Sequence, residues 1–520
     1  MPKQYYPLKD FSLGLNDKAA AHLLDDRELA EATNVVLGTG WVSKRNGYEQ
    51  YATFPAPVRK IYNYLKVNGH MELLVVSDKL YTQDDTICTA IPGTVGNGDR
   101  FSMITVKDRS VNDVALIADG GMLKRYNGID VAVVTPHLPN TQEQENPGLN
   151  ELGNLSAFRA LTMHKGRLYA AAHPVHKNRV SFSHIDPTLG FSVYDYFPAV
   201  NFFDIATNDN DEIIELRTFR DTLVIFCRNT IWALYGNTTS EFQLLKINVP
   251  TGCVAPKSVT AVENNLFYLS DTHVYALFAT DFNTVSAQVI SDKVENTLKG
   301  ISSSEKAKAT GVFHENKYYL SFPSGLTLVY DVLLQAWTKY TNIQANTFLV
   351  REGRLFFGSE NKNVYRFGDV YHDEGQPIPF LLKTKRLDFG SMMNDKKLRR
   401  MWIQSKQYEE SASGYTIDAV FEDETKRLVS NIINDELFPK WDEDPWDTAV
   451  WDAVPHSNPN SAKWDEAVWD SSRWDFLEIQ QEEVRIREKS RTLQLVISND
   501  VRYQPVTIYG IEFEYKPRKP

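Results

Sequence analysis

A strand–turn–strand unit that returns along residues 58–367 constrains the fold of this chain more than any other feature. Each copy has an apolar stretch rich in β-branched and aromatic residues, a tight polar turn, and further strands of the same kind. Gly, Asn and Asp tolerate the positive φ angles that hairpin turns require. Seven such residues, spaced 37 to 55 apart, anchor the copies: Gly69, Asp113, Gly166, Asp221, Asn265, Asn316 and Gly353.

A series of seven antiparallel meanders with this spacing predicts an all-β chain with a β-propeller of about seven blades over residues 55–368. One such sheet cannot bury both of its faces, whereas several sheets stacked around an axis can. The alternative is a pair of irregular β-sandwiches.

The first 54 residues are expected to form an N-terminal arm. Asp25 and Glu28 have the spacing of a capping box, which predicts a short helix over 25–32. Residues 40–54 read as a strand, and the last meander lacks a fourth strand of its own. We therefore expect this strand to pair with the last sheet and close the ring, which removes an exposed edge.

Residues 369–520 alternate between apolar and polar side chains and predict a C-terminal antiparallel β-sandwich, interrupted by a Trp-Asp-rich insert at 436–476. WD40 blades recur every 40 to 45 residues, so these closely spaced pairs do not mark blades. A spacing of five fits neither a helix face nor a strand face and favours a series of turns. The interface candidates in the insert are Trp441, Trp446, Trp451, Trp464, Trp469 and Trp474.

These tryptophans carry a large apolar area that must lie on another surface. We expect that surface to be the sandwich of the same chain or a neighbouring copy. A carbohydrate-stacking platform is one alternative. A calcium site is another, although the EF-hand spacing and its Gly are missing.

The net charge of −11 is unevenly distributed. Residues 441–484 hold twelve acidic residues against two basic ones, so the rest of the chain is close to neutral. This excludes the basic footprint of a tight nucleic-acid-binding protein. A basic cluster in the sandwich is either a solvated strand face or a contact for the acidic insert of another copy; it comprises Lys383, Lys385, Arg386, Lys396, Lys397, Arg399 and Arg400.

No Walker loop, His-Glu-x-x-His motif or Gly-x-Ser-x-Gly elbow is present, so we expect no enzymatic activity and no cofactor. Residues 204–212 are rich in oxygen ligands, and are either a solvated turn or a calcium site. No apolar run is long enough to predict membrane insertion. Four histidines lie within 21 residues, but Pro174 favours an interblade loop over a metal site: His164, His173, His176 and His184.

A motif near the start of the chain resembles a known family. A Phe-x-x-Gly-Leu-Asn opening at 11–16 is followed by Asn34, by the basic pair Lys44-Arg45, and by a Gly-Tyr pair at 47–48. This pattern is similar to the N-terminus of propeller-bearing structural proteins of tailed bacteriophages, which include tail hub, nozzle and tail tubular proteins. It departs from a double-glycine form of the motif, because Leu13 precedes Gly14.

The resemblance implies a non-enzymatic virion protein that is made and assembled in the bacterial cytoplasm. It implies a ring, a hexamer, in the tail or head–tail connector, with portal, adaptor or other tail proteins as neighbours. Genome DNA would pass through without tight binding, since a neutral to acidic wall lacks the Lys and Arg contacts that hold phosphates.

Two other functions fit parts of the pattern. A glycan-binding or glycan-cleaving β-propeller would stack sugar rings on the tryptophans and use acidic pairs from different blades. A cytosolic propeller scaffold would need neither feature.

Overall fold

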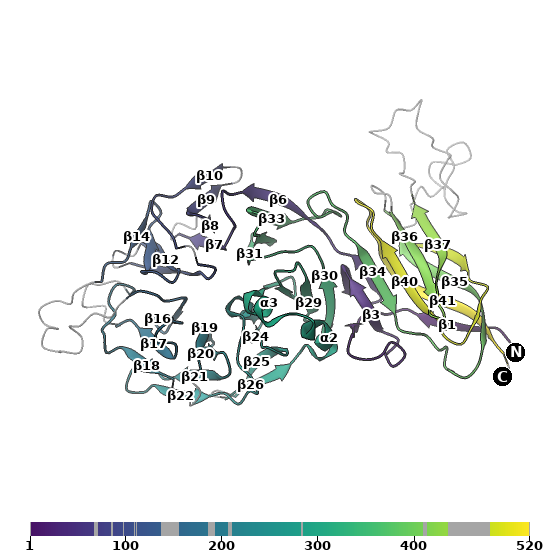
Figure 1. Ribbon diagram of the computed structural model, residues 1–520, viewed down its shortest axis with the longest axis horizontal. Helices are drawn as coiled ribbons and strands as arrows, with labels where there is room; N and C mark the ends of the chain where they lie inside the picture. Colours follow the sequence, from purple (N-terminus) through teal and green to yellow (C-terminus); the bar gives the residue numbers. More distant parts are fainter. Residues whose placement is uncertain are drawn as a thin grey trace, which may run out of the picture. The chain divides into compact units, whose positions relative to one another are not determined.

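In a computed structural model of the chain, the regular secondary structure of the described residues is almost entirely β-strand, which confirms the all-β class (Figure 1). The structure describes residues 2–66, 71–84, 87–96, 98–108, 110, 112–136, 155–185, 193–205, 211–281, 284–408, 413–434 and 479–518. The Trp-rich insert 436–476 and the first anchor, Gly69, lie outside the described residues.

The chain divides into two compact units. Unit 1 comprises Met1–Glu49, Leu328–Asn342 and Phe367–Pro520, and unit 2 comprises Gln50–Thr327 and Ile343–Arg366.

Unit 2 contains a succession of antiparallel sheets, and those from β7 to β26 each have four strands that are consecutive in the chain. The first two sheets comprise β7 (Lys60–Leu65), β8 (Met71–Val76), β9 (Leu80–Asp84) and β10 (Ile87–Ala90), then β11 (Ser102–Lys107), β12 (Asp113–Ala118), β13 (Lys124–Tyr126) and β14 (Val131–Val133). The next two comprise β15 (Ala160–His164), β16 (Arg167–Ala171), β17 (Arg179–Phe182) and β18 (Phe202–Asp204), then β19 (Ile213–Phe219), β20 (Thr222–Cys227), β21 (Ile231–Tyr235) and β22 (Gln243–Lys246). Later strands are β23 (Thr260–Val262), β24 (Asn265–Leu269), β25 (Val274–Asp281) and β26 (Thr284–Val289), the pair β27 (Thr310–His314) and β28 (Lys317–Ser321), and β31 (Thr347–Arg351), β32 (Arg354–Gly358) and β33 (Asn363–Phe367).

Two-residue turns join the first and second strands of several sheets, where the sequence places them. Lys165-Gly166 and Glu352-Gly353 have positive φ at both central residues, and so does Glu315-Asn316. Such turns match the right-handed twist of the strands that they connect. The turn before β24 is shifted by one residue from the expected position, because Val262 pairs with Asn265 and leaves Glu263-Asn264 as the loop.

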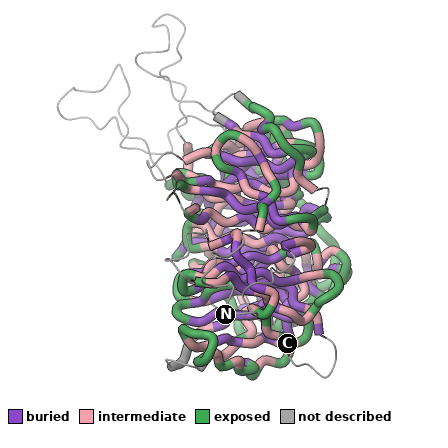
Figure 2. The backbone as a smooth tube through the Cα atoms, turned by 90° about the vertical axis from the view of Figure 1, so that its left-hand side faces the viewer, coloured by how far each residue is buried: buried purple, intermediate pink, exposed green. Residues whose placement is uncertain are grey.

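The sheets of unit 2 follow one another around a common centre (Figure 1). The first strand of a sheet contacts the first strand of the next, from β7 through β11 and β15 to β19, and from β23 through β27 to β31, which contacts β7. Apolar cores lie between successive sheets; Leu74 and Val76 of β8, for example, share a core with Ala115 and Ile117 of β12. Buried residues accordingly occupy the strands and exposed ones the connections (Figure 2). Each sheet therefore buries its faces against its neighbours.

A strand from the N-terminal region completes the last sheet. β6 (Tyr48–Thr53) pairs with β33, as expected for the strand before residue 54. The Phe54 N–H donates to the Lys362 carbonyl, and the Phe54 side chain joins a core formed by the first and last sheets. The chain thus closes its ring of sheets with a segment that precedes the first sheet.

Two short helices lie between β26 and β27: α2 (Glu295–Lys299) and α3 (Ser303–Lys308). No helix among the described residues is long and apolar enough to cross a membrane.

Unit 1 contains two groups of paired strands. The first has the order β38 (Ile479–Arg485), β35 (Lys396–Lys406), β41 (Thr507–Pro517), β5 (Trp41–Lys44) and β4 (Val35–Gly38), with β1 (Gln4–Leu8) on β41 and β39 (Lys489–Ser490) on β35. The second has the order β29 (Thr327–Asp331), β30 (Ala336–Tyr340), β3 (Glu28–Thr33), β34 (Phe380–Thr384), β40 (Gln494–Asn499), β36 (Ser413–Val420) and β37 (Lys426–Asn434), with β2 (Gly14–Leu15) on β3. Residues of the N-terminal arm therefore lie inside both groups.

The helix predicted over 25–32 is wrong, since Glu28 begins strand β3. One contact of the expected capping box does form, because the Asp25 N–H donates to the Glu28 carboxylate over 3.1 Å. Antiparallel pairing of β3 with β34 then satisfies the backbone in an extended conformation. Tertiary pairing overrides the local helix signal.

Candidate functional site

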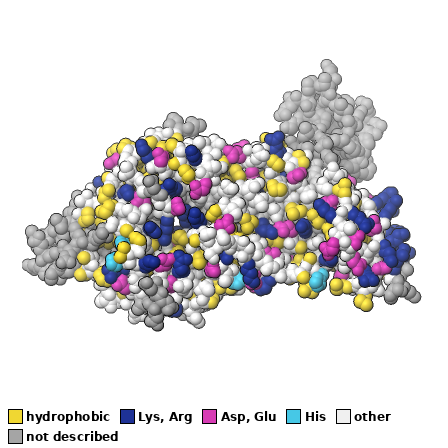
Figure 3. Space-filling model, viewed as in Figure 1, with side chains coloured by type: hydrophobic (Ala, Val, Ile, Leu, Met, Phe, Trp, Pro, Cys, Tyr) yellow, Lys and Arg dark blue, Asp and Glu magenta, His cyan; other side chains and the backbone are white. Residues whose placement is uncertain are grey.

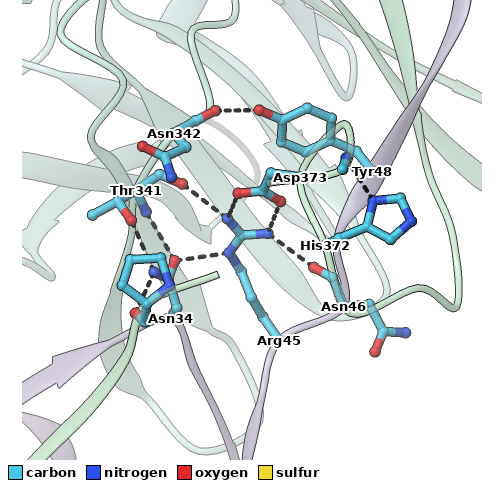
Figure 4. A network of polar contacts seen from close by, with 10 residues as sticks. Asn34, Arg45, Asn46, Tyr48, Thr341, Asn342, His372 and Asp373 are labelled. Carbon is cyan, nitrogen blue, oxygen red and sulfur yellow. Dashed lines mark hydrogen bonds and ion pairs between the residues drawn. The ribbon is translucent and has the colours of Figure 1, made fainter. Parts of the chain in front are cut away.

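Part of the motif that resembles the phage proteins lies around one buried guanidinium in unit 1, that of Arg45, with Asn34 and Tyr48 close to it (Figure 4). Arg45 donates from Nη1 to Asp373 Oδ1 over 2.8 Å and from Nη2 to Asp373 Oδ2 over 2.5 Å. Its Nε donates to Asn34 Oδ1 over 2.8 Å. The remaining two N–H groups donate to the backbone carbonyls of Asn46 and Thr341, over 3.0 and 2.9 Å. All five donors of the guanidinium therefore have acceptors.

Asn34 connects this arginine to a second segment of the chain. Its side-chain oxygen also accepts from the Thr341 N–H over 2.9 Å, and its amide nitrogen donates to Thr341 Oγ1 and to the Pro379 carbonyl. Asn34 has a φ of 56°, a left-handed conformation that Asn adopts more readily than most residues. Asn is therefore well suited to the position that follows Thr33, the last residue of β3.

Burial sets the electrostatics of the Arg45–Asp373 pair. The two side chains are 1% and 2% exposed. Burial raises the pKa of the Asp373 carboxyl, and the Arg45 charge and hydrogen bonds oppose that rise. The Arg45 guanidinium also lies over the Tyr340 ring, 5.5 Å from its centroid. A lysine would replace neither the paired hydrogen bonds nor the planar stacking.

Gly47 and Tyr48 of the motif also lie close to the Arg45 network. A Cβ on Gly47 would lie 1.8 Å from the His372 carbonyl oxygen, so a side chain does not fit there. The Tyr48 hydroxyl donates to the Asn342 carbonyl over 2.6 Å. Lys44 points elsewhere, and its ammonium donates to Asn499 Oδ1 over 2.7 Å and to the Val501 carbonyl over 3.0 Å. Burial, followed by the Arg45 charge, lowers the pKa of Lys44 to about 8.

With all its donors used, the Arg45 network has no guanidinium N–H left to bind a ligand. The network connects residues 34–48, 341–342 and 372–373. We interpret it as a structural cross-link that holds these segments of unit 1 together. Sequence reasoning singled out Lys44, Arg45, Gly47 and Tyr48 but not Asp373. No local pattern around Asp373 distinguishes it from an exposed acidic turn residue.

The basic interface candidates have different surroundings. Lys396 is buried, and its ammonium donates to the backbone carbonyls of Ser391 and Arg491, so it is not part of an exposed surface. Lys397 is exposed. Arg399 lies 3.7 Å from Glu514, and Arg400 lies 3.1 Å from Glu483. Alternation along β35 points Lys396 and Lys397 to opposite faces, and the register shift between Leu398 and Arg400 places Arg400 on the outer side with Lys397.

The four clustered histidines do not gather at one point. His173 and His176 lie in the loop between β16 and β17, as expected, with ring centroids 5.2 Å apart. His184 packs edge-on against Tyr196. His164 is buried at the end of β15. The described residues include no group of three or more His, Cys, Asp or Glu side chains placed to hold a metal ion.

His164 makes the stability of unit 2 depend on pH. Within the described structure neither ring nitrogen has a hydrogen-bond partner, and burial, with the Lys165 charge, lowers its pKa from 6.5 to about 4, against a small opposing effect of Asp221. The unfolded chain therefore binds this proton first. Stability is fully present above about pH 6.5 and falls as pH decreases towards 4, by ~3 kcal/mol in total.

We expect His164→Leu to remove most of this pH dependence, measured as the difference in unfolding free energy between the two ends of that range. His176→Leu, in an exposed loop, serves as the control and should leave the dependence unchanged. Equal slopes for wild type and His164→Leu would contradict the assignment.

Comparison with known proteins identifies the class of this fold. Residues 194–368 match the family Phage_stabilise, described as bacteriophage P22 Gp10, beta-propeller. The match covers β18 to β33, the second half of the succession of sheets. It confirms the resemblance to propeller-bearing structural proteins of tailed bacteriophages and supports a phage tail structural protein, present in the virion. No curated protein matches the chain.

Solved structures are similar to this chain only at low sequence identity and low TM-score. BamB from Moraxella catarrhalis is 12% identical, with 65% of this chain and 92% of BamB covered at a TM-score of 0.37. The Pan2 WD40 domain of Neurospora crassa is 12% identical, with 63% and 95% covered at 0.35. The computationally designed Ika8 protein is 12% identical, with 62% and 99% covered at 0.36.

Proposed function

We propose that this chain is a non-enzymatic structural protein that forms a ring of six copies, a nozzle or hub, in the phage tail or head–tail connector. The match of residues 194–368 to a phage propeller family carries the proposal. The motif at 34–48 supports it, because Asn34 and Arg45 form a buried structural network with Asp373 rather than a reactive centre.

The proposed architecture is a seven-bladed propeller followed by a β-sandwich. The four-stranded sheets of unit 2 and the pair β27–β28, which follow the expected order, support the blade count. The two strand groups of unit 1 support the sandwich. Lys44, on β5 of the first group, donates to Asn499 on β40 of the second, so a polar contact links the two groups.

The contacts between copies are proposed to involve two surfaces. One is the Trp-rich acidic insert, whose aromatic side chains are suited to anchor an interface. The other is the exposed basic side of β35, with Lys397, Arg399 and Arg400. Lys397 lies across from Lys489 on one side and from Lys516 on the other, so this side has a local excess of positive charge.

DNA is proposed to pass through the ring without tight binding. Outside residues 441–484 the chain has a net charge near zero, and the insert is strongly acidic. Each Lys or Arg contact to a phosphate adds salt-dependent affinity, so a wall that lacks them lets DNA slide.

The test is the oligomeric state of the purified full-length chain, alone and mixed with portal–adaptor complexes of a related phage, followed by mass photometry and negative-stain imaging. We expect to observe ring-shaped assemblies at least when the chain is mixed with the portal–adaptor complexes. Replacing the six tryptophans by Ser should abolish rings, while Trp232→Phe in a propeller strand should not. A chain that stays monomeric under all conditions, and that depolymerises or retains polysaccharide, would support the glycan-active alternative instead.

A further inference from the structure

A cavity of about 380 Å³ opens near the middle of unit 2. Five of its lining residues lie shortly before the first strands of several sheets: Arg59 before β7, Arg100 before β11, Lys257 before β23, Lys308 before β27 and Asn346 before β31. Because these first strands surround the common centre, the cavity lies at the end of the ring where they begin. Lys and Arg side chains gather in this region in Figure 3.

The charge of the lining is unbalanced. Four cationic side chains contribute, namely Arg59, Arg100, Lys257 and Lys308, whereas the acidic ones are Asp99 and Glu360, both exposed. Glu360 accepts a hydrogen bond from the Asn346 side-chain amide over 3.0 Å, which occupies part of its capacity.

Lys257 and Arg100 also have N–H groups that could donate hydrogen bonds to a ligand. The Lys257 ammonium donates to the Asn346 carbonyl over 3.1 Å, which uses one of its three protons. Arg100 donates to the Ile214 carbonyl and lies 3.6 Å from Glu215, but its buried Nε has no partner among the described residues. A buried N–H without an acceptor costs free energy, and an oxygen ligand would relieve that cost.

Burial is the main cause of a lowered pKa at two lysines near the cavity. Burial, followed by the charge of Lys60, lowers the pKa of Lys257 to about 8. Burial, followed by the charge of Arg217, lowers the pKa of Lys60 to about 8 as well. Like charges held together in a partly desolvated space favour the entry of an anion.

We propose that this cavity binds a small multivalent oxyanion, of the phosphate or carboxylate class. Arg100 and Lys257 would bind it from opposite parts of the ring, and Lys308 would neutralise it from the exposed side. Charge-assisted hydrogen bonds from Arg and Lys to such oxygens are stronger than neutral ones. The inference does not depend on the ring assembly proposed above.

The test is calorimetric titration of the full-length chain with inorganic pyrophosphate and, separately, with citrate at low ionic strength. We expect saturable binding of at least one probe, and the tighter one identifies the class. Citrate carries no titrating proton near pH 8, so its binding there should take up protons, because the anion raises the lowered pKa values of Lys257 and Lys60. Proton uptake is measured by repeating the titration in buffers of different ionisation enthalpy.

Lys257→Met should weaken binding by about tenfold or more, the loss expected for one charge-assisted hydrogen bond. Lys308→Met changes an exposed side chain, so we expect the variant to fold normally and to bind about threefold or more weakly. Lys79→Met is the matched control, since it removes the same charge from an exposed turn of unit 2. The proposal is overturned if neither probe binds saturably, or if Lys79→Met weakens binding as much as the two cavity variants do.

Discussion

Arg45→Met is expected to destabilise unit 1 by about 3–5 kcal/mol, the cost of removing one partner from a buried ion pair. The methionine leaves the Asp373 carboxylate buried without its two charge-assisted hydrogen bonds. It also leaves Asn34 Oδ1 and the Asn46 and Thr341 carbonyls with fewer donors. Hydrogen exchange of residues 34–48 and 372–373, together with urea unfolding of the whole chain, measures the loss.

Arg386→Met is the control for this experiment, because Arg386 pairs with Glu424 at 2.8 Å and the Glu424 side chain is 76% exposed. An exposed pair contributes about 0–1 kcal/mol. The double variant Arg45→Met, Asp373→Leu should cost less than the sum of its single changes, since no charge remains buried. Equal losses of unfolding free energy for Arg45→Met and Arg386→Met would show that the Arg45 network does not stabilise unit 1.

Phe54→Ala is expected to cost unit 2 about 3–5 kcal/mol, as for other buried aromatic residues. Phe54 is 3% exposed, and its ring lies edge-on against Tyr81, with centroids 5.5 Å apart. It shares a core with Val58, Ile61 and Phe356, from the first and last sheets. The space left by the removed Phe54 ring would therefore lie where the ring of sheets closes. The backbone amides of residues 50–54 and 363–366 should then exchange faster with solvent.

Leu245→Ala provides the comparison, because Leu245 lies on β22 and is 50% exposed. The free energy of unfolding of Leu245→Ala should differ from that of the wild type by no more than about 0.5 kcal/mol. If Phe54→Ala accelerated exchange uniformly across unit 2, or not at all, closure by β6 would not be the specific point of weakness.

Much of the fold could be predicted because its determinants are local. A Gly or Asn between two β-rich stretches specifies a hairpin, and the turns at Lys165-Gly166 and Glu315-Asn316 formed where their residues allow a positive φ. Repetition of that signal indicated the succession of sheets. The strand before residue 54 was predictable for a related reason, because the last meander had too few strands.

What the sequence determined by itself, then, was the all-β class, the hairpins and the resemblance to phage propeller proteins, since each depends on residues close together in the chain. The tertiary structure decided the rest. Residues 28–33 became a strand because β34 supplies backbone partners, Lys396 became buried because of its register on β35, and Arg45 met Asp373 across 328 positions. The basic cavity likewise combines side chains from far-apart sheets. Such pairings depend on burial and electrostatic partners that only the folded chain brings together.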